Sequence, residues 1–81
     1  MRINYSHKAM AQLEALSKDN QKRVAAKMRF FAQQQDIFKF AKFIAAHDAY
    51  RLRVGDYRIY FEVKEDTVTV RTIKRRDKAY D

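Results

Sequence analysis

The sequence predicts a single α+β domain over residues 1–81, in which a short N-terminal strand and a helical hairpin precede an antiparallel three-stranded meander packed on the helices. Apolar residues recur at helical spacing before residue 49 and alternate with polar residues after it. Two short turns divide the alternating part into strands. The chain has no Pro and one Gly, so it offers no linker at which a second domain would begin.

The first expected elements are a strand over residues 2–5 and a helix that follows Ser6, whose hydroxyl is a good N-cap. We expect this helix to end near Asp19 and Asn20. Its buried stripe consists of three apolar residues at helical spacing: Met10, Leu13 and Leu16. A second helix follows, with its own apolar stripe: Val24, Met28 and Phe31.

A further helical turn or two is expected over residues 37–46, capped by Asp36. The apolar residues that would share a face there are Ile37, Phe40, Ala41 and Ile44. Phe38 and Phe43 lie off that stripe. Two interpretations of these aromatic residues stay open: packing in the core or the helix hairpin, or a groove for the amphipathic helix of a partner.

The period changes to two near Ala49, which predicts three strands: residues 50–54, 57–64 and 67–74. A two-residue turn at Gly55-Asp56 would place Arg53 opposite Arg58. It would likewise place Arg51 opposite Tyr60. Alternation then gives the helix-covered face its apolar side chains: Leu52, Val54, Tyr57, Ile59, Phe61 and Val63.

The third strand continues this division, with Val68 and Val70 on the apolar face and Arg71 on the basic one. Ile73 has the parity of Arg71, so we expect either a bulge near Thr72 or the end of the strand there. The segment that follows adds more basic residues and a tyrosine: Lys74, Arg75, Arg76, Lys78 and Tyr80.

The basic sheet face suits an anionic ligand. The chain carries 18 Lys and Arg against 10 Asp and Glu, a net charge of +8, which attracts polyanions such as RNA. Guanidinium groups grip phosphate oxygens bidentately, and tyrosine rings stack on unpaired bases. A solvated face that binds nothing is the alternative, with Glu62 as a counter-ion for Arg51 or Arg58. The expected RNA-binding residues are Lys39, Lys42, Tyr60, Arg71, Lys74 and Lys78.

Several classes of function are not indicated. The chain has no Cys and two His, and no paired carboxylates accompany the histidines, so we expect neither a metal site nor a cofactor. His7 is expected to be an exposed residue, and His47, just before the arginine strand, is the better functional candidate. No long apolar run or signal peptide is seen, so we expect a cytoplasmic protein without membrane contact.

The stretch YRLRVGDYRIYFEV, followed by TVTVRTIKRRDKAY, resembles the C-terminal half of the RelE/ParE superfamily of type II toxin–antitoxin toxins. The order of strand, helical hairpin and meander is similar to that fold as well. The resemblance implies a RelE-type toxin, a ribosome-dependent endoribonuclease that cuts messenger RNA in the A site by metal-free attack of the 2′-hydroxyl and so inhibits translation. It also implies a small cognate antitoxin with an acidic segment, in a heterotetramer or larger complex.

The resemblance implies a role for several residues by position. Arg58 matches the arginine that stabilises the transition state. Arg75 or Arg76 matches the arginine taken as the acid for the leaving group, and the spacing does not choose between them. Tyr80 matches the C-terminal tyrosine that stacks on a base of the message.

Arg51 and Arg53 occupy positions where the best-known RelE toxin has two lysines. Arginine essentially cannot give up its proton, so neither residue suits a general base. Three explanations stay open. The base comes from elsewhere, such as the ribosome or His47; or arginines suffice through electrostatics; or this member is a catalytically weak antitoxin-binding homologue. A ParE-like inhibitor of DNA gyrase is the other alternative that the resemblance allows.

Overall fold

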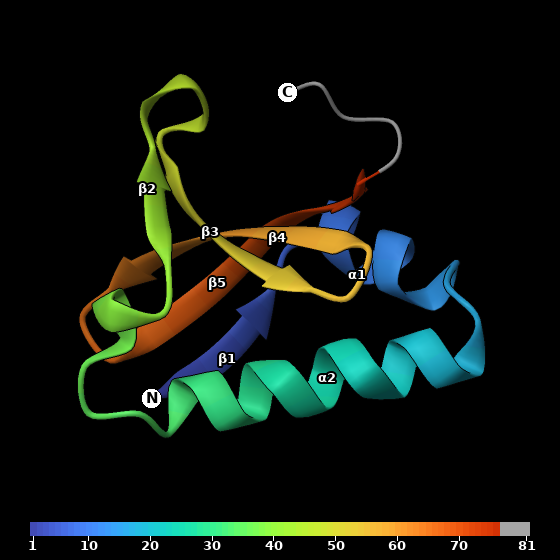
Figure 1. Ribbon diagram of the computed structural model, residues 1–81, viewed down its shortest axis with the longest axis horizontal. Helices are drawn as coiled ribbons and strands as arrows, with labels where there is room; N and C mark the ends of the chain where they lie inside the picture. The colour runs from blue at the N-terminus through green and yellow to red at the C-terminus, as the bar shows by residue number, and fades with distance from the viewer. Residues whose placement is uncertain (77–81) are drawn as a thin grey trace.

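The computed structural model describes residues 1–76, which form a five-stranded sheet with two helices against one face (Figure 1). The order of strands across the sheet is β1-β5-β4-β3-β2. Strand β1 runs parallel to β5, and every other pair of neighbours is antiparallel. The bounds are β1 Arg2–Tyr5, α1 His7–Glu14, α2 Lys18–Ala32, β2 Lys42–Ile44, β3 Ala49–Val54, β4 Tyr57–Lys64 and β5 Thr67–Arg75. The predicted α+β fold is confirmed.

The N-terminal strand joins the sheet beside β5, although β5 is far from it in sequence. The backbone N–H of Arg2 donates to the carbonyl of Asp66 and that of Ser6 to the carbonyl of Val70, each at 2.8 Å. Ser6 then caps α1 as expected, since its hydroxyl oxygen accepts from the backbone N–H of Ala9 at 3.0 Å. No helix within residues 1–76 is long and apolar enough to cross a membrane.

The break between the two helices lies earlier than Asp19 and Asn20, and that expectation is wrong. Helix α1 ends at Glu14, and Ser17 caps α2 by accepting from the backbone N–H of Asn20 at 3.2 Å. The side-chain amide of Gln21 donates to the carbonyls of Glu14 and Leu16 at 3.1 and 2.9 Å. Two caps therefore end one helix and begin the next within three residues.

The segment after α2 begins with a helical turn capped by Asp36, as expected, since the Asp36 carboxylate accepts from the backbone N–H of Phe38 at 3.2 Å, but it does not continue as a helix. It consists of a 3-10 turn, η1 (Ile37–Lys39), the edge strand β2, and a second 3-10 turn, η2 (Ala45–His47). Asp48 adopts the left-handed conformation at φ 50°, which reverses the chain so that β2 pairs with the start of β3. Of the expected helical stripe, Ile37 is 4% exposed but Phe40 is 51% exposed. In β2 the backbone N–H and C=O groups of this segment form hydrogen bonds with β3 instead of with a further helical turn.

Strands β3, β4 and β5 form the expected meander. Val54 pairs with Tyr57 around the Gly55-Asp56 turn, so Arg53 lies opposite Arg58 as predicted. Gly55 has φ +57°, and a Cβ there would come within 3.1 Å of the Arg23 guanidinium. Glycine suits this turn both sterically and conformationally.

Of the two possibilities for the last strand, a bulge near Thr72 or an end there, the structure shows the bulge. Tyr60 pairs with Thr72 but Phe61 pairs with Val70, so Arg71 is the extra residue on β5. The bulge restores Ile73 to the apolar face, where it is buried.

One core fills the space between the helices and the sheet. The edge of the Phe31 ring on α2 meets Phe61 on β4, with 5.1 Å between ring centroids. The core residues from the helices are Ala9, Val24, Met28 and Phe31, and those from the meander are Leu52, Val54, Tyr57, Ile59, Phe61, Val68, Val70 and Ile73. Because these side chains occupy one face of the meander, the alternate residues are left for the other face.

Candidate nucleic-acid interface

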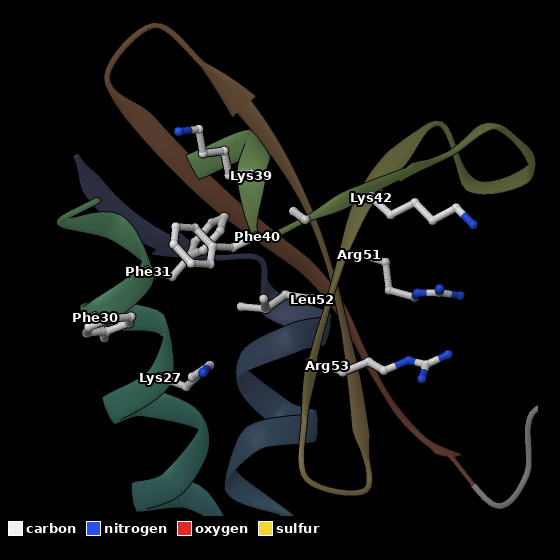
Figure 2. A pocket seen from close by; sticks show the side chains of 10 residues that line it. Lys27, Phe30, Phe31, Lys39, Phe40, Lys42, Arg51, Leu52 and Arg53 are labelled. Carbon is white, nitrogen blue, oxygen red and sulfur yellow. The ribbon is translucent and has the colours of Figure 1, made fainter. Parts of the chain in front are cut away.

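Five of the basic residues on the sheet face that the helices do not cover lie in two neighbouring rows across strands β2 to β5, and we call this set the cationic face: Lys42, Arg51, Arg53, Arg58 and Lys74. Arg58 stands on the middle strand of the meander, opposite Arg53 on one side and opposite Lys74 on the other. Lys42 extends the face onto β2, where it pairs with Arg51. Figure 2 shows Lys42, Arg51 and Arg53 pointing away from the side that holds Phe31 and Leu52.

Residues of like charge pair across the strands of this face. Residues that pair across antiparallel strands have Cβ atoms about 5 Å apart, and like charges there are destabilising. Arg58 and Lys74 are half-buried, so water screens them less than it screens the exposed Arg53. A phosphate between these cations would replace repulsion with charge-assisted hydrogen bonds.

Tyr60 lies on the same face but beneath another ring. Its side chain is 2% exposed, and His47 of η2 lies over it with 4.3 Å between centroids and a tilt of 38°. Lys74 Nζ is 5.9 Å from the Tyr60 ring centroid. The sequence predicted an open ring for a base, whereas here His47 occupies that position.

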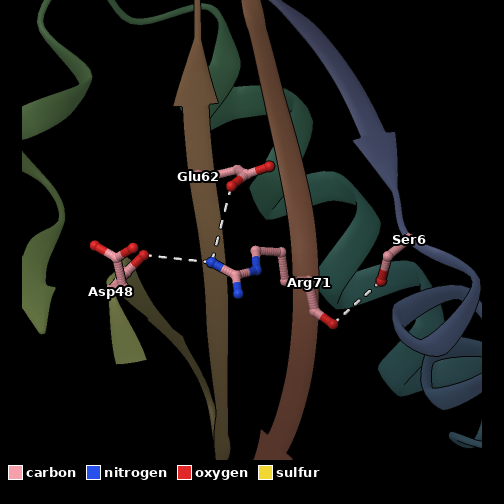
Figure 3. A network of polar contacts seen from close by, with 4 residues as sticks. All are labelled: Ser6, Asp48, Glu62 and Arg71. Atoms are coloured by element: carbon pink, nitrogen blue, oxygen red, sulfur yellow. Dashed lines mark hydrogen bonds and ion pairs between the residues drawn. The ribbon is translucent and has the colours of Figure 1, made fainter. Parts of the chain in front are cut away.

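Arg71 fixes the turn that carries His47. Its Nη1 donates to the backbone carbonyl of Asp48 at 3.3 Å and lies 3.8 Å from a carboxylate oxygen of Glu62 (Figure 3). On the other side of β5, the carbonyl of Arg71 accepts from the Ser6 hydroxyl at 3.1 Å. Glu62, expected as a counter-ion for Arg51 or Arg58, therefore lies beside Arg71 instead.

A cleft of about 450 Å³ lies between α2 and strands β2 and β3. Lys27 and Lys39 border it, and its apolar side chains are Phe30, Phe31, Phe40 and Leu52 (Figure 2). Lys39 and Lys42, predicted to share an RNA-binding rim, both line this cleft, and so do Arg51 and Arg53. The cleft therefore adjoins the cationic face, to which Lys42 also belongs by register. The sequence did not lead us to expect Lys27 and Phe30 in this cleft. Their spacing of three residues, which places them on the same side of a helix, was the available signal.

The two candidates for the acid also differ in place. Arg75 pairs with Tyr57 and lines a shallow depression beside Asn20, on the helix side of the sheet. The backbone N–H of Arg76 donates to the carbonyl of Asp56 at 2.6 Å, next to the turn that follows Arg53. Lys78 and Tyr80 lie outside the described residues.

Comparison with known proteins gives a consistent result. Residues 3–80 match the sequence model of the ParE toxin of type II toxin–antitoxin systems, parDE. Toxin RelE3 of Methanocaldococcus jannaschii is 49% identical over 35 residues, which are 43% of this chain and 40% of that protein. The chain therefore matches less than half the length of that curated relative.

Solved toxin–antitoxin complexes contain chains of the same fold. The intact Escherichia coli RelBE complex matches with a TM-score of 0.75 and 15% identity, over 91% of this chain and 94% of that one. The RelB–RelE complex of Methanococcus jannaschii matches with a TM-score of 0.71 and 25% identity, over 95% and 94%. The archaeal RelE–RelB complex of Pyrococcus horikoshii matches with a TM-score of 0.74 and 22% identity, over 96% and 97%.

Proposed function

The chain belongs to the ParE toxin family of type II toxin–antitoxin systems, and we propose that it inhibits translation as a ribosome-dependent endoribonuclease that cleaves messenger RNA in the A site. The observation that carries the proposal is the cationic face, where Arg58 lies between Arg53 and Lys74 across three adjacent strands. A protein that acts on the ribosome works in the cytoplasm.

The chemistry of RNA cleavage explains why such a face is useful. When the 2′-oxygen attacks the adjacent phosphorus, negative charge accumulates on a crowded phosphorane before the 5′-oxygen leaves. Preorganised cations stabilise that charge at no cost of reorganisation. Arg58, held on the central strand, contacts the phosphorane, while Arg51, Arg53 and Lys42 bind the flanking backbone.

Arg76 is the better of the two candidates for protonating or stabilising the leaving oxygen. Its backbone is hydrogen-bonded beside the Gly55-Asp56 turn, close to the end of the strand that carries Arg53. Arg75 is the poorer candidate because it pairs with the buried Tyr57, on the helix-covered side of the sheet. Tyr80 remains the candidate for stacking on a base of the message.

The cleft between α2 and β3 supports a cognate antitoxin as the partner. Phe30 and Phe40 offer half-exposed apolar surface, and Lys27 and Lys39 border it. A segment with apolar and acidic residues would bury those rings and pair with both ammonium groups. We propose that the small antitoxin supplies such a segment in a heterotetramer or larger complex.

The proposal is tested by adding the purified protein to ribosomes that carry a defined message and mapping the ends of the cut RNA. Arg58→Ala should lower the cleavage rate about 100- to 1,000-fold, because it removes one preorganised cation from the transition state. Arg2→Ala is the control, since it removes the same charge from the edge strand β1, which β5 separates from the strand of Arg58. Equal rates for Arg58→Ala and the control would contradict the proposal.

A second candidate function is inhibition of DNA gyrase, which the resemblance to ParE-like toxins implies and which the match of residues 3–80 to the ParE toxin model keeps in view. It predicts intact messages together with loss of gyrase supercoiling activity and double-strand breaks in DNA. Cleavage that appears only after Arg51→Lys and Arg53→Lys would instead indicate a catalytically weak homologue.

A further inference from the structure

RNA cleavage needs a group that accepts the proton of the 2′-hydroxyl, and the cationic face does not offer an obvious one. Its side chains are arginines and lysines. Arginine keeps its proton at any physiological pH, and lysine ordinarily loses its own only far above neutrality. Histidine is the side chain that ordinarily exchanges a proton near pH 7.

His47 reaches this face from a segment outside the meander. Turn η2 brings its ring to 4.3 Å from the ring of Tyr60, and the imidazole stays half-buried. Asp48, in the left-handed conformation, ends the turn, and Arg71 donates to its carbonyl at 3.3 Å (Figure 3). The imidazole is therefore held by a ring below it and a hydrogen bond next to it.

The position of Tyr60 places His47 beside the proposed phosphate site. Tyr60 pairs with Arg51 across the hairpin, which puts their Cβ atoms about 5 Å apart. Arg58 lies two residues before Tyr60 on the same face, about 7 Å along the strand. If Arg51 and Arg58 bind one phosphate, the imidazole of His47 lies beside that phosphate, close enough to reach the ribose attached to it.

We infer that His47 is the proton acceptor of this site, an inference that rests on the proposed endoribonuclease function. The neutral imidazole takes the proton of the 2′-hydroxyl as the 2′-oxygen forms its bond to phosphorus. The bond between phosphorus and the 5′-oxygen breaks, and that oxygen takes a proton from water or from an acid on the protein. The products are a 2′,3′-cyclic phosphate and a 5′-hydroxyl, and the imidazolium returns its proton to solvent.

Charged groups surround the two residues that hold His47, namely Tyr60 beneath its ring and Asp48 next to it in the chain. Arg51, which Lys42 flanks on β2, pairs with Tyr60, and Lys74 Nζ lies 5.9 Å from the Tyr60 ring. Arg71 donates to the carbonyl of Asp48 and lies beside Glu62. A neutral acceptor is the active form, so the rate of cleavage should rise with pH.

The test measures single-turnover cleavage of ribosome-bound message from pH 5.5 to 8.5 with the full chain. His47→Gln should lower the rate at pH 7.5 about 100- to 10,000-fold and abolish the rise with pH. His7→Gln is the matched control, because His7 is an exposed residue at the start of α1. It should retain both the rate and the pH profile of the unmodified protein.

His47→Phe separates proton transfer from packing. Phenylalanine keeps a ring over Tyr60 but cannot accept a proton, so this variant should be as slow as His47→Gln while its thermal unfolding stays close to that of the unmodified protein. Activity retained in His47→Phe, or a His47→Gln variant that keeps the rise with pH, would overturn the inference. An unmodified protein that cuts no message would instead overturn the proposed function, and the inference with it.

Discussion

On the helix-covered face of the sheet, Ile59 and Phe61 pack among apolar side chains from α1 and α2, whereas on the opposite face their neighbours Arg58 and Tyr60 lie among cations. Both sets alternate along one strand, β4. The first face removes apolar surface from water, at about 25 cal/mol for each Å² buried. The second places residues of like charge opposite one another across the strands and offers no such gain. The contrast separates a face that holds the fold from the face on which the proposed ligand would bind.

The largest expected effect comes from breaking the apolar face. Phe61→Ala should lower the free energy of unfolding by about 3–5 kcal/mol, because it leaves a cavity beneath Phe31. Urea unfolding followed by circular dichroism measures the change. Phe30→Ala is the control, since this ring is half-exposed at the cleft and its loss should cost less than about 1 kcal/mol. Similar losses in the two variants would contradict the division of roles between the faces.

A smaller effect, of opposite sign, is expected on the cationic face. Arg53→Glu turns the repulsion with Arg58 into attraction and should raise the free energy of unfolding by about 0.2–1 kcal/mol. Cleavage of message should fall in the same variant. The gain should shrink in 1 M salt, where exposed charges are screened within about 3 Å.

Arg53→Gln provides the intermediate step for that comparison, because it removes the repulsion without adding attraction. Its stability should lie between those of the unmodified protein and Arg53→Glu. A loss of stability in both variants would show that the cationic face contributes to folding without a ligand.

The smallest effect concerns Tyr5, whose pKa is raised above 10.0 by burial, an effect partly offset by Arg29. The unfolded chain then loses the tyrosine proton before the folded one does, so this residue's contribution is present below pH 10 and declines as the pH rises further. Tyr5→Phe should make the alkaline decline of stability shallower. Unfolding in urea between pH 8 and 11 measures both slopes, and equal slopes would exclude this contribution.

Local patterns were sufficient to predict the hairpin from sequence. Gly55-Asp56 allows a two-residue turn, and that turn fixes which residues pair, so the position of Arg53 opposite Arg58 follows by counting. The bulge near Thr72 follows in the same way, because Ile73 would otherwise leave the apolar face. The N-cap at Ser6 is equally local.

Segments whose partners are distant in sequence could not be predicted in this way. Residues 37–47 have apolar side chains at helical spacing, yet β2 forms there because β3 supplies backbone hydrogen-bonding groups across the Asp48 turn. The break before α2 was misplaced because Gln21 donates back to carbonyls at the end of α1. In each case a group elsewhere in the chain decides between two local conformations of similar free energy.

The sequence by itself determined the meander, the two faces of its strands and the gathering of arginines on one of them, because alternation and turn length act over a few residues. Only the tertiary structure decided that Tyr60 is covered by His47 and that Lys39 and Lys42 line one cleft with Phe30 of α2. Those placements depend on β2 and η2 folding against the sheet. Contacts between segments that are distant in sequence stabilise these placements, and a local sequence pattern does not predict such contacts.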